Sequence, residues 1–101
     1  MLAHVVFFTL KDSSAAAQQR LLDGCLRDLT SHPGTVFFGV GPRTPDLCRP
    51  VNDQTYHFGL HVIFASRADH DRYQLDERHL RFVAEQRDNW AQVRVFDSDL
   101  P

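Results

Sequence analysis

The first half of the chain begins with an apolar run over residues 2–10, rich in β-branched and aromatic side chains and too short for a typical helix. This run predicts a strand. Residues 12–14 are candidate helix caps, and apolar residues then recur every three or four positions until His32-Pro33-Gly34 stops the pattern. The spacing predicts a helix over residues 14–31.

The middle of the chain contains two further strand patterns. Residues 35–40 are β-branched and aromatic between glycines, whereas the three prolines within residues 41–53 indicate a loop. Residues 54–65 then alternate well, which predicts a strand with two distinct faces. One face carries Tyr56, Phe58, Leu60, Val62 and Phe64, and the other carries His57, Gly59, His61 and Ile63.

The last third of the chain has a helical pattern that is interrupted once. Ser66 precedes Asp69 by three residues, an acidic variant of a capping box, and helical spacing continues to Trp90. The phase breaks over residues 76–78, so two helical pieces with a kink are expected. Residues 93–96 predict the final strand.

The predicted order β-α-β-β-α-β is typical of an α+β, ferredoxin-like protomer, a four-stranded antiparallel sheet with its helices on one face. Residues 1–101 are expected to form a single domain. The helices cover only one face, yet Ala3, Val5 and Phe7 make the other side of the first strand apolar. A second copy of the sheet is the simplest cover, so we predict a homodimer.

Composition excludes several classes of partner. The formal charge of -2 comes from 11 basic and 13 acidic residues that are mixed along the chain, which argues against nucleic acid. No stretch approaches the length of a membrane span, and no signal peptide is recognisable, so a cytoplasmic location is expected. Cys25 and Cys48 lack the spacing of metal or redox motifs and are predicted to be free thiols.

The candidate chemistry lies between the sheet and the helices. His4 shares its strand face with Val6 and Phe8, and it should point toward the same hollow as His79. The predicted ligand pocket consists of His4, Val6, Phe8, Leu22, Cys25, Leu60, Val62, Phe82 and Trp90. No nucleophile elbow or phosphate-binding glycine loop occurs, and no cofactor or metal ion is expected.

These segments together resemble the stress-responsive A/B barrel (Dabb) family over nearly the whole chain. The resemblance rests on His4-Val5-Val6-Phe7-Phe8, Pro33-Gly34, the strand from Tyr56 to Ser66, the segment with Tyr73, His79 and Phe82, and Val93-Arg94-Val95-Phe96-Asp97. It implies ferredoxin-like protomers that pair sheet to sheet as a dimeric α/β barrel. The family includes plant stress proteins of unclear activity and a plant polyketide cyclase that uses neither metal nor cofactor.

The resemblance also implies a site. Tyr73 and His79 match the catalytic pair of that cyclase, and His4 matches a pocket histidine. The sequence departs from the cyclase at Cys25, at Phe58 and at Asp76-Glu77, which implies a different or smaller ligand. His79 is a candidate general base and Tyr73 a candidate donor to an oxyanion, although His79 could instead pin the helical kink.

A paired sheet would place the alternate strand face inside the barrel. The residues predicted for the barrel interior and dimer interface are Val5, Phe7, His57, His61 and Ile63. His57 and His61 lie about 13 Å apart along an extended strand, too far to share a metal ion within one chain. They favour a hydrated lumen, with a pH-sensitive interface or a metal shared across the two-fold axis as alternatives.

Three functional hypotheses follow. The first is a homodimer that binds a small hydrophobic or aromatic molecule between sheet and helices. The second is a cofactor-free cyclase or lyase in which neutral His79 abstracts a proton next to a carbonyl and Tyr73 stabilises the enolate. The third is a non-catalytic, stress-related dimer.

Overall fold

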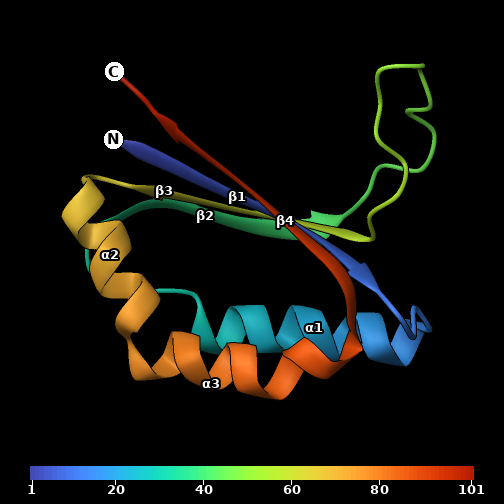
Figure 1. The fold of residues 1–101 in the computed structure, drawn as a ribbon, viewed down its shortest axis with the longest axis horizontal. Coiled ribbons are helices and arrows are strands. Elements are labelled where there is room, and N and C mark those ends of the chain that lie inside the picture. Colours follow the sequence, from blue (N-terminus) through green and yellow to red (C-terminus); the bar gives the residue numbers. More distant parts are fainter.

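The computed structural model describes residues 1–101 as four strands and three α-helices. The elements are β1 (Leu2–Leu10), α1 (Ala15–Asp28), β2 (Thr35–Pro42), β3 (Phe58–Phe64), α2 (Arg67–Leu75), α3 (Glu77–Gln86), a 3-10 turn (Arg87–Asn89) and β4 (Trp90–Asp99). The strands form one antiparallel sheet in the order β2-β3-β1-β4. All helices lie on the same side of the sheet (Figure 1), which confirms the ferredoxin-like plan.

The two faces of β1 differ in burial because side chains alternate along a strand. Its even-numbered residues, from Leu2 to Leu10, are buried beneath the helices, and its odd-numbered residues are half-buried on the other side. In the register of the sheet, His4 lies between Val62 of β3 and Asp97 of β4. β1 therefore brings a histidine onto the helix-covered face beside a carboxylate on the edge strand.

Helix α1 begins as predicted but ends three residues early, at Asp28 rather than residue 31. Ser14 caps its start by accepting a hydrogen bond from the amide of Ala17 at 3.2 Å. At its end, Nε2 of His32 bonds the carbonyl of Asp28 at 2.7 Å, and Ser31 has a positive φ of 63°. The bond from His32 satisfies a carbonyl group at the helix end, and the positive φ of Ser31 reverses the direction of the chain. The helix therefore ends where the apolar spacing alone predicted another turn.

The predicted kink in the last helical segment is confirmed at Asp76. This residue is extended, and it separates α2 from α3. Its carboxylate accepts a hydrogen bond from the amide of Arg78 at 2.8 Å, which caps the start of α3. The separation lets α2 and α3 follow different lines over the sheet.

Three strand lengths differ from their predictions, and the first is β2, which runs to Pro42 rather than residue 40. β3 starts at Phe58 rather than residue 54, because the carboxylate of Asp53 accepts a hydrogen bond from the amide of Thr55 at 2.8 Å and holds a turn there. β4 spans Trp90–Asp99 rather than 93–96, because it pairs with the whole of β1. An edge strand tolerates polar residues that weaken a strand pattern in the sequence.

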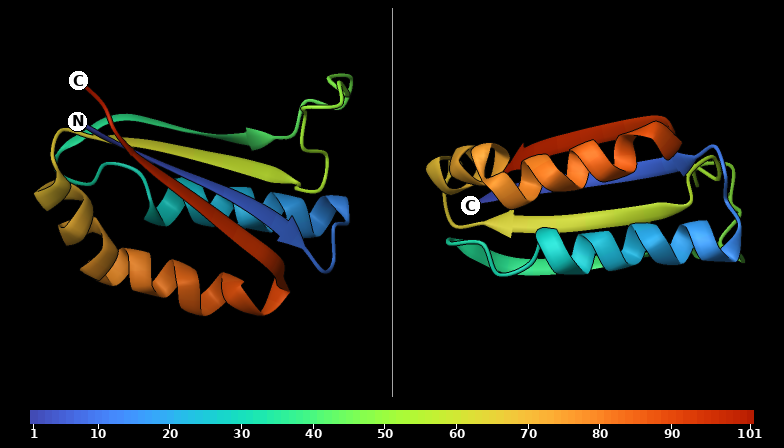
Figure 2. Two further views of the ribbon diagram at one scale, coloured as in Figure 1. Left: turned by 45° about the horizontal axis from the view of Figure 1, so that its top comes forward. Right: turned by 90° about the horizontal axis from the view of Figure 1, so that it is seen from below.

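The sheet face opposite the helices is uncovered (Figure 2). Its side chains are partly apolar. Phe7 lies at its centre, with ring centroids 4.7 Å from Tyr56 and 5.9 Å from Phe96. Tyr56 was predicted to share the face of Phe58 but lies on this face instead, because it precedes β3 and is outside the alternation of that strand. Phe37 and Phe96 are 55% and 48% exposed. An apolar patch of this kind usually marks a contact surface.

Two smaller sequence predictions concern the cysteines and the membrane. Both cysteines are free thiols as predicted, Cys25 buried and Cys48 exposed. None of the helices is both long and apolar enough to cross a bilayer.

Candidate functional site

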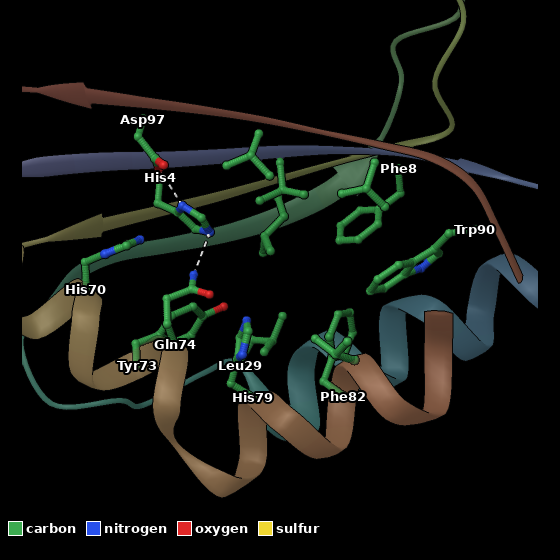
Figure 3. A pocket seen from close by; sticks show the side chains of 15 residues that line it. His4, Phe8, Leu29, His70, Tyr73, Gln74, His79, Phe82, Trp90 and Asp97 are labelled. Carbon is green, nitrogen blue, oxygen red and sulfur yellow. Dashed lines mark hydrogen bonds and ion pairs between the residues drawn. The ribbon is translucent and has the colours of Figure 1, made fainter. Parts of the chain in front are cut away.

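A cavity of about 380 Å³ lies between β1 and β4 on one side and α2 and α3 on the other. Fifteen residues line it, ten of them hydrophobic. Figure 3 shows the polar residues His4, His70, Gln74 and Asp97 gathered at one end and the aromatic residues Phe8, Phe82 and Trp90 at the other. The cavity is therefore apolar along most of its length with a polar end.

Most residues predicted for the site line this cavity. They are His4, Val6, Phe8, Leu60, Tyr73, His79, Phe82 and Trp90. The three other predicted pocket residues do not line it: Cys25 and Val62 are fully buried core residues, and Leu22 packs against that core. The reason is the placement of α1, which covers the β2 and β3 side of the sheet while α3 covers the β1 and β4 side (Figure 2).

Seven lining residues were not predicted from the sequence, and three of them come from β4. The seven are Leu29, His70, Gln74, Val83, Val93, Val95 and Asp97. The signal for the β4 set is the alternation of Val93, Val95 and Asp97, which share one strand face. This alternation identifies them as cavity residues only once β4 is known to pair along the whole of β1.

His70, on α2, was not among the residues predicted for the site, yet it is largely buried. Only 14% of its side chain is exposed. Its ring packs with centroids 5.1 Å from His4 and 5.7 Å from Phe64. The N-terminal part of α2 lies close over the sheet and turns this residue inward, which no local pattern in α2 indicates.

His4 is buried and paired with a carboxylate. Its Nδ1 lies 2.6 Å from Oδ1 of Asp97. An ionised carboxylate only accepts hydrogen bonds, so this nitrogen carries the proton. Nε2 of His4 lies 3.5 Å from the amide nitrogen of Gln74, which is the only protein group in hydrogen-bonding range of it. In neutral His4 this second nitrogen is a hydrogen-bond acceptor at the polar end of the cavity.

Tyr73 is held at the centre of a histidine cluster. Its ring centroid lies 4.8 Å from His79, 4.9 Å from His32 and 6.1 Å from His4. Burial raises the pKa of the Tyr73 phenol well above its usual value. The phenol is thus neutral at physiological pH and available as a hydrogen-bond donor.

His79 is also neutral. Burial lowers the pKa of its imidazole, and the neighbouring His4 and His32 lower it further. Its Nδ1 is buried without a hydrogen-bond partner. A backbone hydrogen bond with Gln74 opposes this lowering of the pKa, and the neighbouring kink is capped by Asp76.

Four of the five residues predicted for the barrel interior occupy the uncovered side of the sheet, and His57 differs from them. Val5, Phe7 and Ile63 are half-buried there and His61 is exposed. His57 precedes β3, and its Nδ1 accepts a hydrogen bond from the amide of Leu10 at 2.9 Å. The two histidines are therefore not equivalent, because one is engaged by the backbone.

Comparison with known structures shows the same fold in several proteins. A Dabb family protein with a ferredoxin-like fold from Mesorhizobium loti has a TM-score of 0.81 and 26% identity, with 99% of this chain and 96% of that chain covered. A dimeric ferredoxin-like protein of unknown function from Thermobifida fusca has a TM-score of 0.82 and 13% identity, with 98% and 90% covered.

A third similar structure is the hydroxynitrile lyase of Passiflora edulis, with a TM-score of 0.75 and 19% identity, covering 99% of this chain and 93% of that chain. No curated protein matches the chain. The model of the stress responsive A/B barrel domain matches residues 2–100. Because this match spans almost every residue, the chain belongs to the stress responsive A/B barrel (Dabb) family.

Proposed function

We propose that this chain acts as a homodimer whose protomers each bind a small, mainly apolar molecule in the cavity between sheet and helices. The observation that carries the proposal is the cavity itself, which combines apolar walls with a cluster of polar groups at one end. Its volume of about 380 Å³ falls at the small end of the range for ligand pockets.

Dimerisation is supported by the uncovered sheet face and by one similar structure. Phe7, Phe37 and Phe96 lie on that face, where apolar surface contributes favourably to association when it is removed from water. The Thermobifida fusca protein of the same fold is described as dimeric. Two copies that pair through these faces leave the cavities, which lie on the opposite side of each sheet, accessible.

The polar end indicates what the ligand carries. The neutral phenol of Tyr73 donates a hydrogen bond, and Nε2 of His4 accepts one. A carbonyl or hydroxyl group on an otherwise apolar or aromatic molecule suits this pair. A strongly charged ligand is disfavoured by the apolar walls of the cavity.

A cavity-filling substitution tests the binding site. Val83→Phe adds a bulky ring to the cavity wall, so we expect about tenfold weaker binding of 2-naphthol, an aromatic hydroxyl probe, in a fluorescence titration. Leu80→Phe, on the exposed face of the same helix, is the matched control and should leave the affinity unchanged. Equal affinity in both variants and the unmodified protein would contradict a ligand site in this cavity.

The natural ligand can be identified by an experiment that assumes no particular compound. We expect a small molecule to copurify with the protein, and mass spectrometry of the denatured protein detects it. The same extraction from the Val83→Phe variant should yield less of it.

Proton-transfer catalysis is the second candidate, favoured by the pairing of neutral Tyr73 with neutral His79 on one cavity wall. In this reaction His79 takes a proton from the carbon next to a carbonyl, and Tyr73 donates a hydrogen bond to the oxygen on which negative charge develops. The imidazolium then returns the proton to the product. The hydroxynitrile lyase shares the fold, and at 19% identity that likeness concerns the fold alone.

This second candidate predicts a large kinetic effect. On a panel of poly-β-keto substrates, any turnover should fall about 100-fold or more in His79→Ala and in Tyr73→Phe, because each removes a group that acts in the transition state. His61→Ala, on the other side of the sheet, is the control. Turnover that survives both cavity substitutions would sink the catalytic roles.

A further inference from the structure

We propose that His4, His70 and Asp97 form a binding site for one divalent transition-metal ion at the polar end of the cavity. This inference goes beyond the proposed function, which requires only an apolar pocket with hydrogen-bonding groups. The three residues come from β1, α2 and β4, so the site is assembled only when the edge strand and the kinked helical segment meet over the sheet.

The spacing of the three side chains fits a metal ion. One potential ligand atom from each residue lies within 4.8 Å of the other two. Bonds from zinc to imidazole or carboxylate are about 2.0–2.2 Å, so two ligand atoms of a tetrahedral zinc ion lie about 3.4 Å apart. Nδ1 of His4 and Oδ1 of Asp97 lie 2.6 Å apart, so this pair must open by roughly 0.8 Å to admit the ion.

The ring of His70 is held for this role by a second carboxylate. Its Nδ1 lies 2.9 Å from Oδ1 of Asp71, which leaves Nε2 free. Histidines that bind metals usually donate their other N–H to a carboxylate or carbonyl, because this fixes the tautomer and makes the free nitrogen more basic. Nε of Arg67 lies 2.8 Å from the same carboxylate of Asp71, so the positive charge of the arginine is compensated.

The donor set selects the kind of ion. Two imidazoles and one carboxylate suit zinc, iron or cobalt, whereas magnesium and calcium prefer oxygen ligands. Three protein ligands leave at least one coordination position open, and here that position faces the cavity.

The hydrogen bond between His4 and Asp97 is the competitor of the ion. An ion that enters between Nδ1 and the carboxylate replaces this bond and releases its proton to solvent. Asp97 is able to adjust, because 45% of its side chain is exposed. His4 is 7% exposed and anchored on the central part of the sheet, so it remains in place.

Titration of the metal-free protein with Co²⁺ tests the site directly. We expect one Co²⁺ per chain with visible absorption typical of nitrogen and oxygen ligands, and displacement of that ion by Zn²⁺. His70→Ala and Asp97→Asn should each weaken Co²⁺ binding about 100-fold, because each removes a direct ligand of the ion. His61→Ala, which removes an exposed histidine from the other sheet face, should leave the affinity unchanged.

Three results would overturn the proposal: no stoichiometric Co²⁺ binding, unchanged affinity in His70→Ala, or an equal loss in His61→Ala. Circular dichroism of each variant verifies that weakened binding does not reflect unfolding. The 2-naphthol titration is repeated without metal. If 2-naphthol still binds while Co²⁺ does not, the metal site fails and the proposed function stands.

Discussion

Replacing Asp28 by asparagine is expected to lower the free energy of unfolding by about 3 kcal/mol, the typical cost of breaking a buried ion pair. The side chain of Asp28 is fully buried. Its carboxylate accepts hydrogen bonds from Arg27 at 2.8 Å and from Nε of Arg81 at 3.1 Å. The bond from Arg81 joins the end of α1 to α3. For a domain of this size the loss corresponds to roughly 15 °C in melting temperature.

The same carboxylate should make stability depend on acid. Hydrogen bonds from Arg27 and then Arg81 lower the pKa of Asp28 from 3.8 to about 2. A lowered pKa contributes stability that is complete above the unfolded value and is lost as the pH falls through the folded value. The contribution of Asp28 is therefore present above pH 4 and declines toward pH 2, and Asp28→Asn should be less sensitive over this interval.

The control for both measurements is Asp23→Asn. Asp23 is exposed on the same helix and accepts a hydrogen bond only from Gln19. Its replacement should change the free energy of unfolding by less than about 0.5 kcal/mol in chemical denaturation. Protein concentration must match among the samples because dimerisation shifts apparent stability. Similar losses in the two variants would show that the Asp28 network does not stabilise the fold.

Placing aspartate at Phe7 is expected to weaken the proposed dimer at least 100-fold. Phe7 lies in the centre of the uncovered sheet face between Tyr56 and Phe96. A carboxylate that is buried there without a partner costs about 3 kcal/mol, which corresponds to two powers of ten in the dissociation constant. Sedimentation velocity over a concentration series measures the change.

Leu80→Asp provides the matched substitution for this experiment. Leu80 is 53% exposed on α3, on the helical side of the molecule. It should leave the protein dimeric, and both variants should retain the circular dichroism of the unmodified protein. A monomer at micromolar concentration before any substitution, or a dimer that tolerates Phe7→Asp, would refute pairing through this face.

The local pattern of apolar and polar residues was sufficient to predict the elements whose structure depends mainly on burial of one face. The alternation of β1 and of Phe58 to Phe64 follows from burial on one side of a sheet, and the break at Asp76 follows from a lost helical phase. Both features depend on neighbours within a few residues. They could therefore be predicted from the sequence, and so could the order of the elements.

The polar end of the cavity depends instead on partners far apart in the chain. Asp97 meets His4 only because β4 pairs along the whole of β1, and polar residues near the end of β4 conceal that extent. His70 is turned inward because α2 packs over the sheet, and the pattern of residues within α2 does not predict that packing. The pairing of Asp28 with Arg81 likewise joins residues that are 53 positions apart.

The alternation of β1 has a consequence for how such a protein can diverge. Neighbouring residues of this strand belong to different surfaces. His4 and Val6 line the cavity, whereas Val5 and Phe7 lie on the uncovered face. A single inserted or deleted residue within β1 would exchange these sets and place the histidine on the wrong side of the sheet. We therefore expect insertions and deletions to be tolerated in segments such as residues 43–57, and the two surfaces of β1 to change independently through point substitutions.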